Sequence, residues 1–448
     1  MSGAGEPRAS VVLDPEVTET LEAVSDLEDR RFDQVEVFAK KGRSRRVTLS
    51  PQHRTSVYSE ERGWAVRAGD RRASFFASGT GRVAPGGPWP EPDGLGLRLP
   101  KPHAAPGWNP PSDFESPLIG EREGVALLEG IARTLEEELP GSRLLQGAVE
   151  DGASEAQLIN SHGLGCSFRH RLASLRLEAV APGTSGVGAS LYLAERDARR
   201  FNPLALARRL ADRLSILCHG QPRSRDRGDC LLAPPLMARL LAGLTPMLVG
   251  TEAKKRVDRL WGGDRRIAGE TLTLLDDGRF PGGALEAPVD GEGVATRETV
   301  LVDSGEYRRP LLAWWQVRGS EYRETGCSRR ASWRDLPSPG PTHLYLRPRA
   351  GVSVGDLLGG IARGYYLLES TGAGRFDWQE NRFQIPVCGL EVRRGRATGP
   401  VCGSVLSGKI TGFLGSIQAV ARDLAFLPLD GMIGSPTVLA TGLDLLAG

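Results

Sequence analysis

Two histidines and one cysteine are regularly spaced in one segment of the sequence. His162, Cys166 and His170 follow one another at four-residue intervals. On a helix these three side chains would share one face and could hold a metal ion. Gly163 and Gly165 interrupt a helix, however, and on a strand the same spacing would spread the side chains along the chain. The local sequence therefore favours a strand over a metal site.

Covalent catalysis would need a nucleophile beside a base. Cys218 precedes His219, Cys327 lies near two arginines, and Cys166 with His170 is the pair that an autonomous hydrolase would use. Neighbours in sequence do not aim side chains at one another, and a reactive thiolate also needs an open, electropositive setting. The sequence holds no H-E-x-x-H zinc motif and no Walker phosphate loop. We therefore expect no autonomous catalytic site.

Carboxylates and glycines gather in the stretch 280–305. Two turns, Pro281–Gly283 and Asp290–Gly293, precede the β-branched run Val294–Val302. This pattern predicts a strand between turns, which is either a ligand-binding edge or an ordinary hairpin. The candidate site residues of this stretch are Gly282, Gly283, Asp290, Gly291, Glu292, Gly293, Thr296 and Arg297.

Length and composition limit the class of protein. A chain of 448 residues is long enough for two domains, and 40% apolar with 25% charged residues is ordinary for a soluble globular protein. A net charge of +2 provides no overall field for nucleic acid or an anionic membrane. The six scattered cysteines include no CxxC pair, and the first residues lack the pattern of a secretory signal. We therefore expect a cytoplasmic protein with reduced cysteines.

The N-terminal sequence predicts a disordered tail at residues 1–13, followed by an α+β domain at residues 14–220. Short alternating runs between 35 and 76 predict antiparallel strands separated by turns at Lys41-Gly42, Glu61–Gly63 and Gly69-Asp70. Residues 83–113 are rich in proline and glycine and predict a long loop, either a lid or a plain connection. Apolar periodicity predicts helices at 14–27, 124–139 and 203–218, and strands at 143–150, 155–161, 165–181 and 188–195.

A polar segment at residues 221–229 is expected to be a linker. The sequence after it, residues 230–448, predicts a mainly antiparallel β domain of barrel or sandwich type. Helices are predicted at 235–249 and 409–424, and the apolar tail after Gly434 is expected to join a sheet. Strands are expected at 294–302, 311–318, 342–347, 364–368 and 382–391. The predicted fold class of the whole chain is α+β.

Several short segments, in order over about 400 residues, resemble one protein family. The N-terminal segments are Val35-Glu36-Val37 and Glu60–Arg67. The C-terminal segments are 274–277, 280–283, 290–296, 372–377, 422–424 and 434–437. Together they resemble the TldD/PmbA family, in which one subunit carries zinc on an H-E-x-x-x-H helix with a further cysteine ligand. The other subunit, TldE or PmbA, has a similar fold and no metal, and the pair forms a heterodimeric peptidase acting on unfolded or short peptides.

The resemblance implies that both parts of the zinc site are missing here. The helix at the matching place, 235–244, has neither histidine nor glutamate, and residues 427–433 have no cysteine. The chain is thus similar to the TldE/PmbA side of the family. The resemblance implies no cofactor in this chain, zinc in a TldD-like partner, and a peptide substrate. It also implies that this chain is a pseudoenzyme, inactive alone, whose eight candidate residues shape the substrate or partner cleft.

Two other functions stay open at this point. The chain could be an autonomous hydrolase that uses Cys166 and His170. It could instead be a homodimeric peptide-binding or scaffold protein, or a factor that helps to mature one natural-product peptide, without catalysis of its own.

Overall fold

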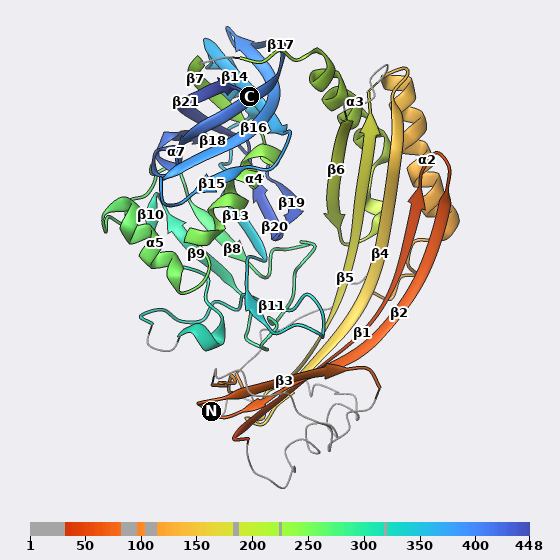
Figure 1. Ribbon diagram of the computed structural model, residues 1–448, viewed down its shortest axis with the longest axis vertical. Coiled ribbons are helices and arrows are strands. Elements are labelled where there is room, and N and C mark those ends of the chain that lie inside the picture. The colour runs from red at the N-terminus through yellow and green to blue at the C-terminus, as the bar shows by residue number, and fades with distance from the viewer. Residues whose placement is uncertain (1–31, 82–95, 104–113, 182–187, 224–225, 318–319) are drawn as a thin grey trace, which may run out of the picture.

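The N-terminal part of the chain forms one long antiparallel sheet. The computed structural model describes residues 32–81, 96–103, 114–181, 188–223, 226–317 and 320–448. The sheet has the order β3-β2-β1-β4-β5-β6, and every neighbouring pair is antiparallel. Its strands are β1 (Gln34–Leu49), β2 (Arg54–Gly69), β3 (Ser74–Gly79), β4 (Arg143–Asn160), β5 (Gly165–Val180) and β6 (Gly188–Glu195). Their length and curvature are visible in Figure 1.

The long strands correct part of the prediction. The expected turns at Lys41-Gly42 and Glu61–Gly63 are wrong, because β1 and β2 each run unbroken and Gly42 pairs with Glu61. Both sides of β1 are hydrogen-bonded, to β2 and to β4, so the ladder keeps Gly42 extended. The predicted strands 143–150 and 155–161 are likewise one strand, β4. The turn near Gly69-Asp70 is confirmed, since Asp70 N donates to Ala73 O at 2.9 Å.

Two helices cover one face of this sheet. They are α2 (Glu121–Glu138) and α3 (Pro203–His219), close to the predicted 124–139 and 203–218. Leu128, Ile131, Leu210 and Leu214 pack against alternate residues of β4, β5 and β6, so the opposite face of the sheet is left for the rest of the chain. The predicted helix 14–27, the tail 1–13 and most of the loop 83–113 lie outside the described residues. Within residues 96–103 there is no helix or strand.

A five-stranded barrel forms the far end of the C-terminal part. Its strands follow the order β14-β7-β21-β17-β16, and pairing between β14 and β16 closes the ring. They are β7 (Asp226–Leu232), β14 (Arg363–Ser370), β16 (Arg382–Arg393), β17 (Arg396–Lys409) and β21 (Val438–Ala447). Two short strands extend the sheet, β15 (Arg375–Asp377) beside β16 and β18 (Ile417–Val420) beside β21. β7 begins inside the predicted linker 221–229.

A second, mixed sheet lies between the barrel and the turn region of 280–297. Its order is β10-β9-β8-β13-β20-β19, and β13 and β20 are parallel. The strands are β8 (Leu274–Asp277), β9 (Glu298–Asp303), β10 (Glu306–Tyr307), β13 (His343–Leu346), β19 (Ala425–Leu429) and β20 (Gly431–Ser435). The remaining elements are α4 (Pro234–Leu244), α5 (Glu252–Trp261), α6 (Val354–Gly359), α7 (Ile410–Ser416), and the pair β11 (Ser328–Arg329) and β12 (Ser338–Pro339). α4 packs between barrel strand β14 and strands β19 and β20.

The predicted fold class is confirmed, with two local corrections. The α+β class, the antiparallel N-terminal sheet and the C-terminal barrel are all present, and the apolar tail forms β21. The strand expected at 311–318 is wrong, because Trp314–Val317 form a 3-10 turn. The helix expected at 409–424 ends at Ser416, since Ile417–Val420 pair with β21. No helix among the described residues is both long and apolar enough to cross a bilayer.

Candidate functional site

The turn Asp290–Gly293 is built around the Asp290 carboxylate. Its Oδ1 accepts from the backbone N of Glu292 and of Val294, both at 2.9 Å, and its Oδ2 accepts from Ser328 N at 3.0 Å. Gly293 closes the turn with φ +79°, in the left-handed region that favours glycine. β9 begins at Glu298, so the predicted strand 294–302 is shorter than expected. One carboxylate therefore holds the turn and ties it to β11.

Glu292 is enclosed at the junction of the two parts of the chain. Its Oε2 accepts from Ser328 Oγ at 2.5 Å and from Trp314 N at 3.0 Å. Its Oε1 lies 3.7 Å from Nη1 of Arg67 on β2, and the side chain is fully buried. Burial raises the pKa of Glu292, and the nearby Arg67 opposes that rise. Burial, with the Glu292 charge beside it, raises the pKa of Asp290 to about 8.

A buried ion network joins the N-terminal sheet to this turn. Arg67 donates to Glu36 of β1 through Nε at 2.9 Å and Nη2 at 2.6 Å. Arg330, which follows β11, pairs with the same Glu36 carboxylate and donates from Nε to Gly291 O at 2.8 Å. Burial alone would raise the pKa of Glu36, but the two guanidinium groups outweigh it and lower that pKa. The network fixes the turn against β1 and β2.

A cavity of about 520 Å³ opens beside this network. One wall is the face of the N-terminal sheet opposite α2 and α3, including Lys40, Ser154 and His170. The other wall comes from the C-terminal part, and it includes the predicted Asp290, Gly291 and Thr296. The wall is mixed in character, with Phe38 and Phe168 beside the charged Lys40, Arg329 and Arg330. The volume and the mixed lining of this cavity are typical of ligand pockets in general.

The other predicted site residues lie away from the lining of this cavity. Gly282 is exposed in its turn, at φ +72°, and Gly283 packs so closely on His343 that a Cβ would lie 2.3 Å from Nε2. Glu292 and Gly293 are buried behind the cavity wall. Arg297 is exposed and its Nη2 donates to Glu324 O at 2.8 Å. The structure thus brings three of the eight predicted residues to the cavity.

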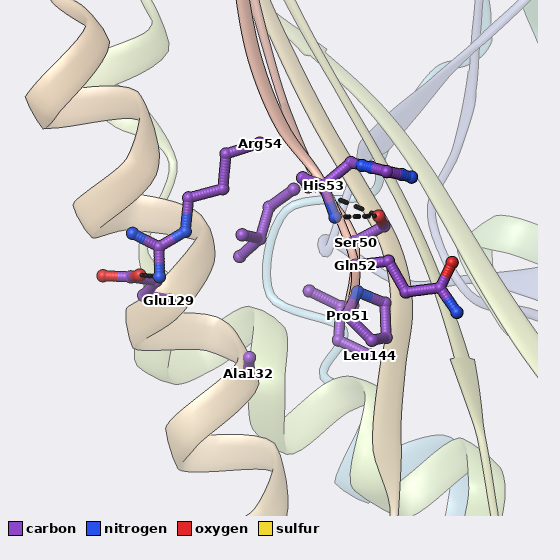
Figure 2. A pocket seen from close by; sticks show the side chains of 9 residues that line it. Ser50, Pro51, Gln52, His53, Arg54, Glu129, Ala132 and Leu144 are labelled. Atoms are coloured by element: carbon purple, nitrogen blue, oxygen red, sulfur yellow. Dashed lines mark hydrogen bonds and ion pairs between the residues drawn. The ribbon is translucent and has the colours of Figure 1, made fainter.

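A further hollow of about 500 Å³ lies at the turn between β1 and β2, beside α2 (Figure 2). Ser50 Oγ accepts from His53 N at 3.1 Å, and Arg54 Nη2 lies 2.5 Å from Glu129 Oε1. These contacts close the turn and attach it to the helix. The hollow contains none of the predicted site residues and no cluster of groups suited to catalysis, so the cavity at Asp290 is the stronger candidate.

Comparison with known proteins places the chain in a family. Residues 225–446 match the family model described as the PmbA/TldA metallopeptidase C-terminal domain. The chain belongs to the TldD/PmbA family. A metalloprotease of Methanothermobacter thermautotrophicus is 24% identical over 334 residues, which cover 70% of this chain and 68% of that protein. A metalloprotease TldD homolog of Buchnera aphidicola is 26% identical over 172 residues, covering 38% of this chain and only 35% of that protein.

Solved structures share the same fold. TldE from Thermococcus kodakarensis superposes with a TM-score of 0.82 at 19% identity, covering 95% of this chain and 99% of that one. A Thermotoga maritima protein superposes with a TM-score of 0.81 at 17% identity, covering 96% of this chain and 99% of that one. At these identities the likeness establishes the fold of the chain from the long sheet to the barrel.

Zinc, which the TldD/PmbA family implies, does not fit the residues present on α4. Leu236, Met237, Leu240, Leu241 and Leu244 are buried in the apolar core, and the exposed residue of the same helix is Arg239. An arginine cannot act as a zinc ligand, and no histidine or carboxylate replaces it. β20 supplies no cysteine. Over the described ranges of the chain, no three histidine, cysteine or acidic side chains gather as a metal site.

The residues considered for nucleophilic chemistry are not arranged for it. Cys166 is buried and burial raises its pKa to about 12, while burial raises the pKa of Cys327 still further. His170 is turned to the backbone of Ala284, with Nε2 2.9 Å from its O, and burial lowers its pKa to about 4. Cys166 and His170 are also four residues apart on β5, or roughly 13 Å along a strand. The pair is therefore too far apart for direct proton transfer.

Sequence reasoning missed Glu36, Arg67 and Arg330 as part of the site. One signal was available: Glu36 stands between two valines, and Arg67 ends an apolar run. A charge within a buried strand needs a partner of opposite charge. The sequence alone does not identify that partner, because Arg330 lies 294 residues from Glu36.

Proposed function

We propose that this chain is the metal-free, TldE-like subunit of a heterodimeric zinc metallopeptidase that hydrolyses unfolded or short peptides. The observation that carries the proposal is the set of residues on α4. This helix carries buried leucines and an exposed arginine where the resemblance places zinc ligands. In this proposal the zinc and the water it activates belong to a TldD-like partner.

The share of this chain would be to hold the peptide. The face of the N-terminal sheet opposite α2 and α3, here called its inner face, would form one wall of the cleft. The small residues Gly42, Gly152 and Ser154 on this wall would leave room for a peptide. β6 and β19 are edge strands of two different sheets and lie beside one another. Their backbone groups could pair with an extended peptide, and such pairing is largely independent of the side chains of the peptide.

The decisive experiment compares the isolated chain with a mixture of the chain and a TldD-like protein. We expect the isolated chain to contain no stoichiometric zinc and to leave an unfolded peptide intact. We expect the mixture to form a complex that contains zinc and hydrolyses the peptide. Stoichiometric zinc or hydrolysis in the isolated chain would overturn the proposal. A stable homodimer that ignores the TldD-like protein would support the scaffold alternative instead.

A substitution on the sheet wall of the cleft tests the role of this chain within the complex. Ser154→Tyr puts a large side chain between Gly42 and His170, away from the buried ion network. Turnover should fall at least tenfold while complex formation persists. Thr55→Tyr is the matched control, because Thr55 is an exposed residue of the same sheet outside the cavity lining. Equal turnover in the two variants would contradict a cleft at this wall.

A further inference from the structure

Three arginines lie together where the N-terminal and C-terminal parts meet near α4. Arg209 and Arg213 come from α3, and Arg239 comes from α4. With Glu369 of β14 they line a small cavity between the edge strands β6 and β19. Arg213 is paired with Glu369 and also donates to Ser190 O of β6, and both members of the ion pair have side chains that are 11% exposed. Arg213 is therefore held in place by its neighbours.

The positive charge of this cluster exceeds its negative charge. Arg209 and Arg239 are close enough to stabilise the charge of Glu369, yet neither forms an ion pair with any described residue. Three guanidinium groups thus lie around one carboxylate, with Arg209 and Arg213 partly buried and Arg239 exposed. Like charges in such a setting repel one another, and an added anion would relieve that repulsion.

The size of the cavity limits the anion that it can take. Its volume is about 30 Å³, which is room for about two water-sized groups. The two oxygens of a carboxylate match that space and match the planar donor fork of an arginine. A tetrahedral phosphate with four oxygens is less well accommodated.

The cluster also adjoins a groove on the inner face of the sheet. Tyr192 lines both the arginine cavity and a groove of about 460 Å³ along the inner face of the sheet. That groove shares Lys40, Ser154, His170 and Leu172 with the cavity at Asp290. An extended chain lying in the groove would reach the arginines with one end.

We propose that Arg209, Arg213 and Arg239 form a carboxylate-binding subsite that takes the carboxylate at the end of a peptide lying in this groove. That the carboxylate belongs to a peptide rests on the proposed function, whereas the binding of a carboxylate does not. Arg239 then has a role on the helix where relatives are expected to hold zinc. It anchors the substrate instead of a metal.

The first measurement tests the anion site without any peptide or partner. The variant is Arg209→Gln with Arg239→Gln, which spares Arg213 and so leaves Glu369 paired. The control is Arg208→Gln with Arg347→Gln, which removes the same charge from exposed arginines paired to Glu138 and Glu298. Sodium acetate, at constant ionic strength against sodium chloride, should raise the melting temperature of the wild type and the control but not of the variant. An absent shift in the wild type, or a larger shift with phosphate, would overturn the carboxylate site.

The second measurement identifies the source of the carboxylate. A fluorescent unstructured peptide is titrated into the chain as the free acid, as the C-terminal amide, and as an amide that ends in glutamate. We expect the free acid to bind roughly tenfold or more tightly than the plain amide, with the preference lost in the Arg209/Arg239 variant and kept in the control. Recovery with the glutamate amide would assign the site to acidic side chains instead. An acetate effect without any peptide binding would contradict the peptide assignment and the proposed function, and would leave the anion site standing.

Discussion

The Glu36 carboxylate on β1 and the Arg330 guanidinium beyond β11 form a buried ion pair across the boundary between the two parts of the chain. The two side chains are 1% and 2% exposed, and 294 residues separate them in sequence. Arg67 completes the arrangement by donating two hydrogen bonds to the same carboxylate. One acidic side chain thus joins two strands of the N-terminal sheet to the segment that follows β11.

Removing that charge should destabilise the protein strongly. Glu36→Gln leaves Arg67 and Arg330 buried without a full counter-charge, and breaking a buried pair in this way costs about 3–5 kcal/mol. Urea denaturation should show the loss as a lower midpoint. Glu252→Gln is the control, because Glu252 and its partner Lys255 are exposed on α5, where such a pair contributes about 0–1 kcal/mol. Equal effects of the two substitutions would contradict a structural role for the buried network.

The stability of the protein should also depend on pH through Asp290. Burial raises the pKa of this carboxyl from 3.8 to about 8, so between these values the folded state holds a proton that the unfolded state has released. The contribution of Asp290 is therefore fully present below about pH 4 and is lost as pH rises towards 8. Asparagine does not titrate, so the stability of the wild type relative to Asp290→Asn should fall by up to about 1.4 kcal/mol per pH unit.

Denaturation of both proteins at pH 5, 6, 7 and 8 measures that difference. Titrating groups far from Asp290 are common to the two proteins and cancel, whereas Glu292 interacts with the Asp290 charge and contributes to the same difference. Stability profiles that run parallel over this range would show that Asp290 is ionised in the folded protein, contrary to the prediction.

His343 should hold one tautomer and stay neutral well below the ordinary pKa of histidine. Leu285 N donates to Nε2 at 3.3 Å, so the ring proton is on Nδ1, which lies 3.0 Å from Asp277 O. Burial lowers the pKa of His343 from 6.5 to about 4. Its contribution to stability is therefore present above about pH 6.5 and is lost as pH falls towards 4.

Nitrogen-15 NMR of the histidine ring reports the tautomer and its titration directly. We expect the Nδ1–H form to persist from pH 8 to about pH 5. In denaturation, His343→Gln should weaken the loss of stability on the acid side. A ring that titrates near 6.5 would contradict the hydrogen bond from Leu285.

Elements that are determined by nearby residues, such as amphipathic helices and glycine turns, could be predicted from the sequence. Helices α2 and α3 were found from apolar periodicity, and the turn at Asp290 from its glycines and carboxylate. The sequence predicts a turn at Gly63, and this prediction is wrong. In the structure Gly63 lies within β2, where a Cβ would be 2.1 Å from Cε2 of Trp333. The glycine allows a close approach from a distant segment, and no local pattern indicates such an approach.

The candidate site shows the same limit. Residue spacing does not identify a partner for Glu36, and it marks Arg239 only as part of a helix without zinc ligands. Both the buried network and the arginine cluster consist of side chains brought together from separate strands and helices. Such contacts depend on packing between the two parts of the chain, which residue spacing alone does not determine.

Alanine substitutions at two glycines separate backbone strain from crowding in the candidate site. Gly293 and Gly282 have similar positive φ values, 79° and 72°, so alanine is strained by about 1–2 kcal/mol at either position. A Cβ at Gly293 would also lie 2.9 Å from Leu164 Cδ2 and 3.2 Å from Leu158 Cδ2, whereas at Gly282 nothing lies within 4 Å. Crowding of this kind in a packed core costs about 1–3 kcal/mol more. Gly293→Ala should therefore lower the free energy of unfolding by the larger amount, and equal losses in urea denaturation would show that the turn is not packed against β4.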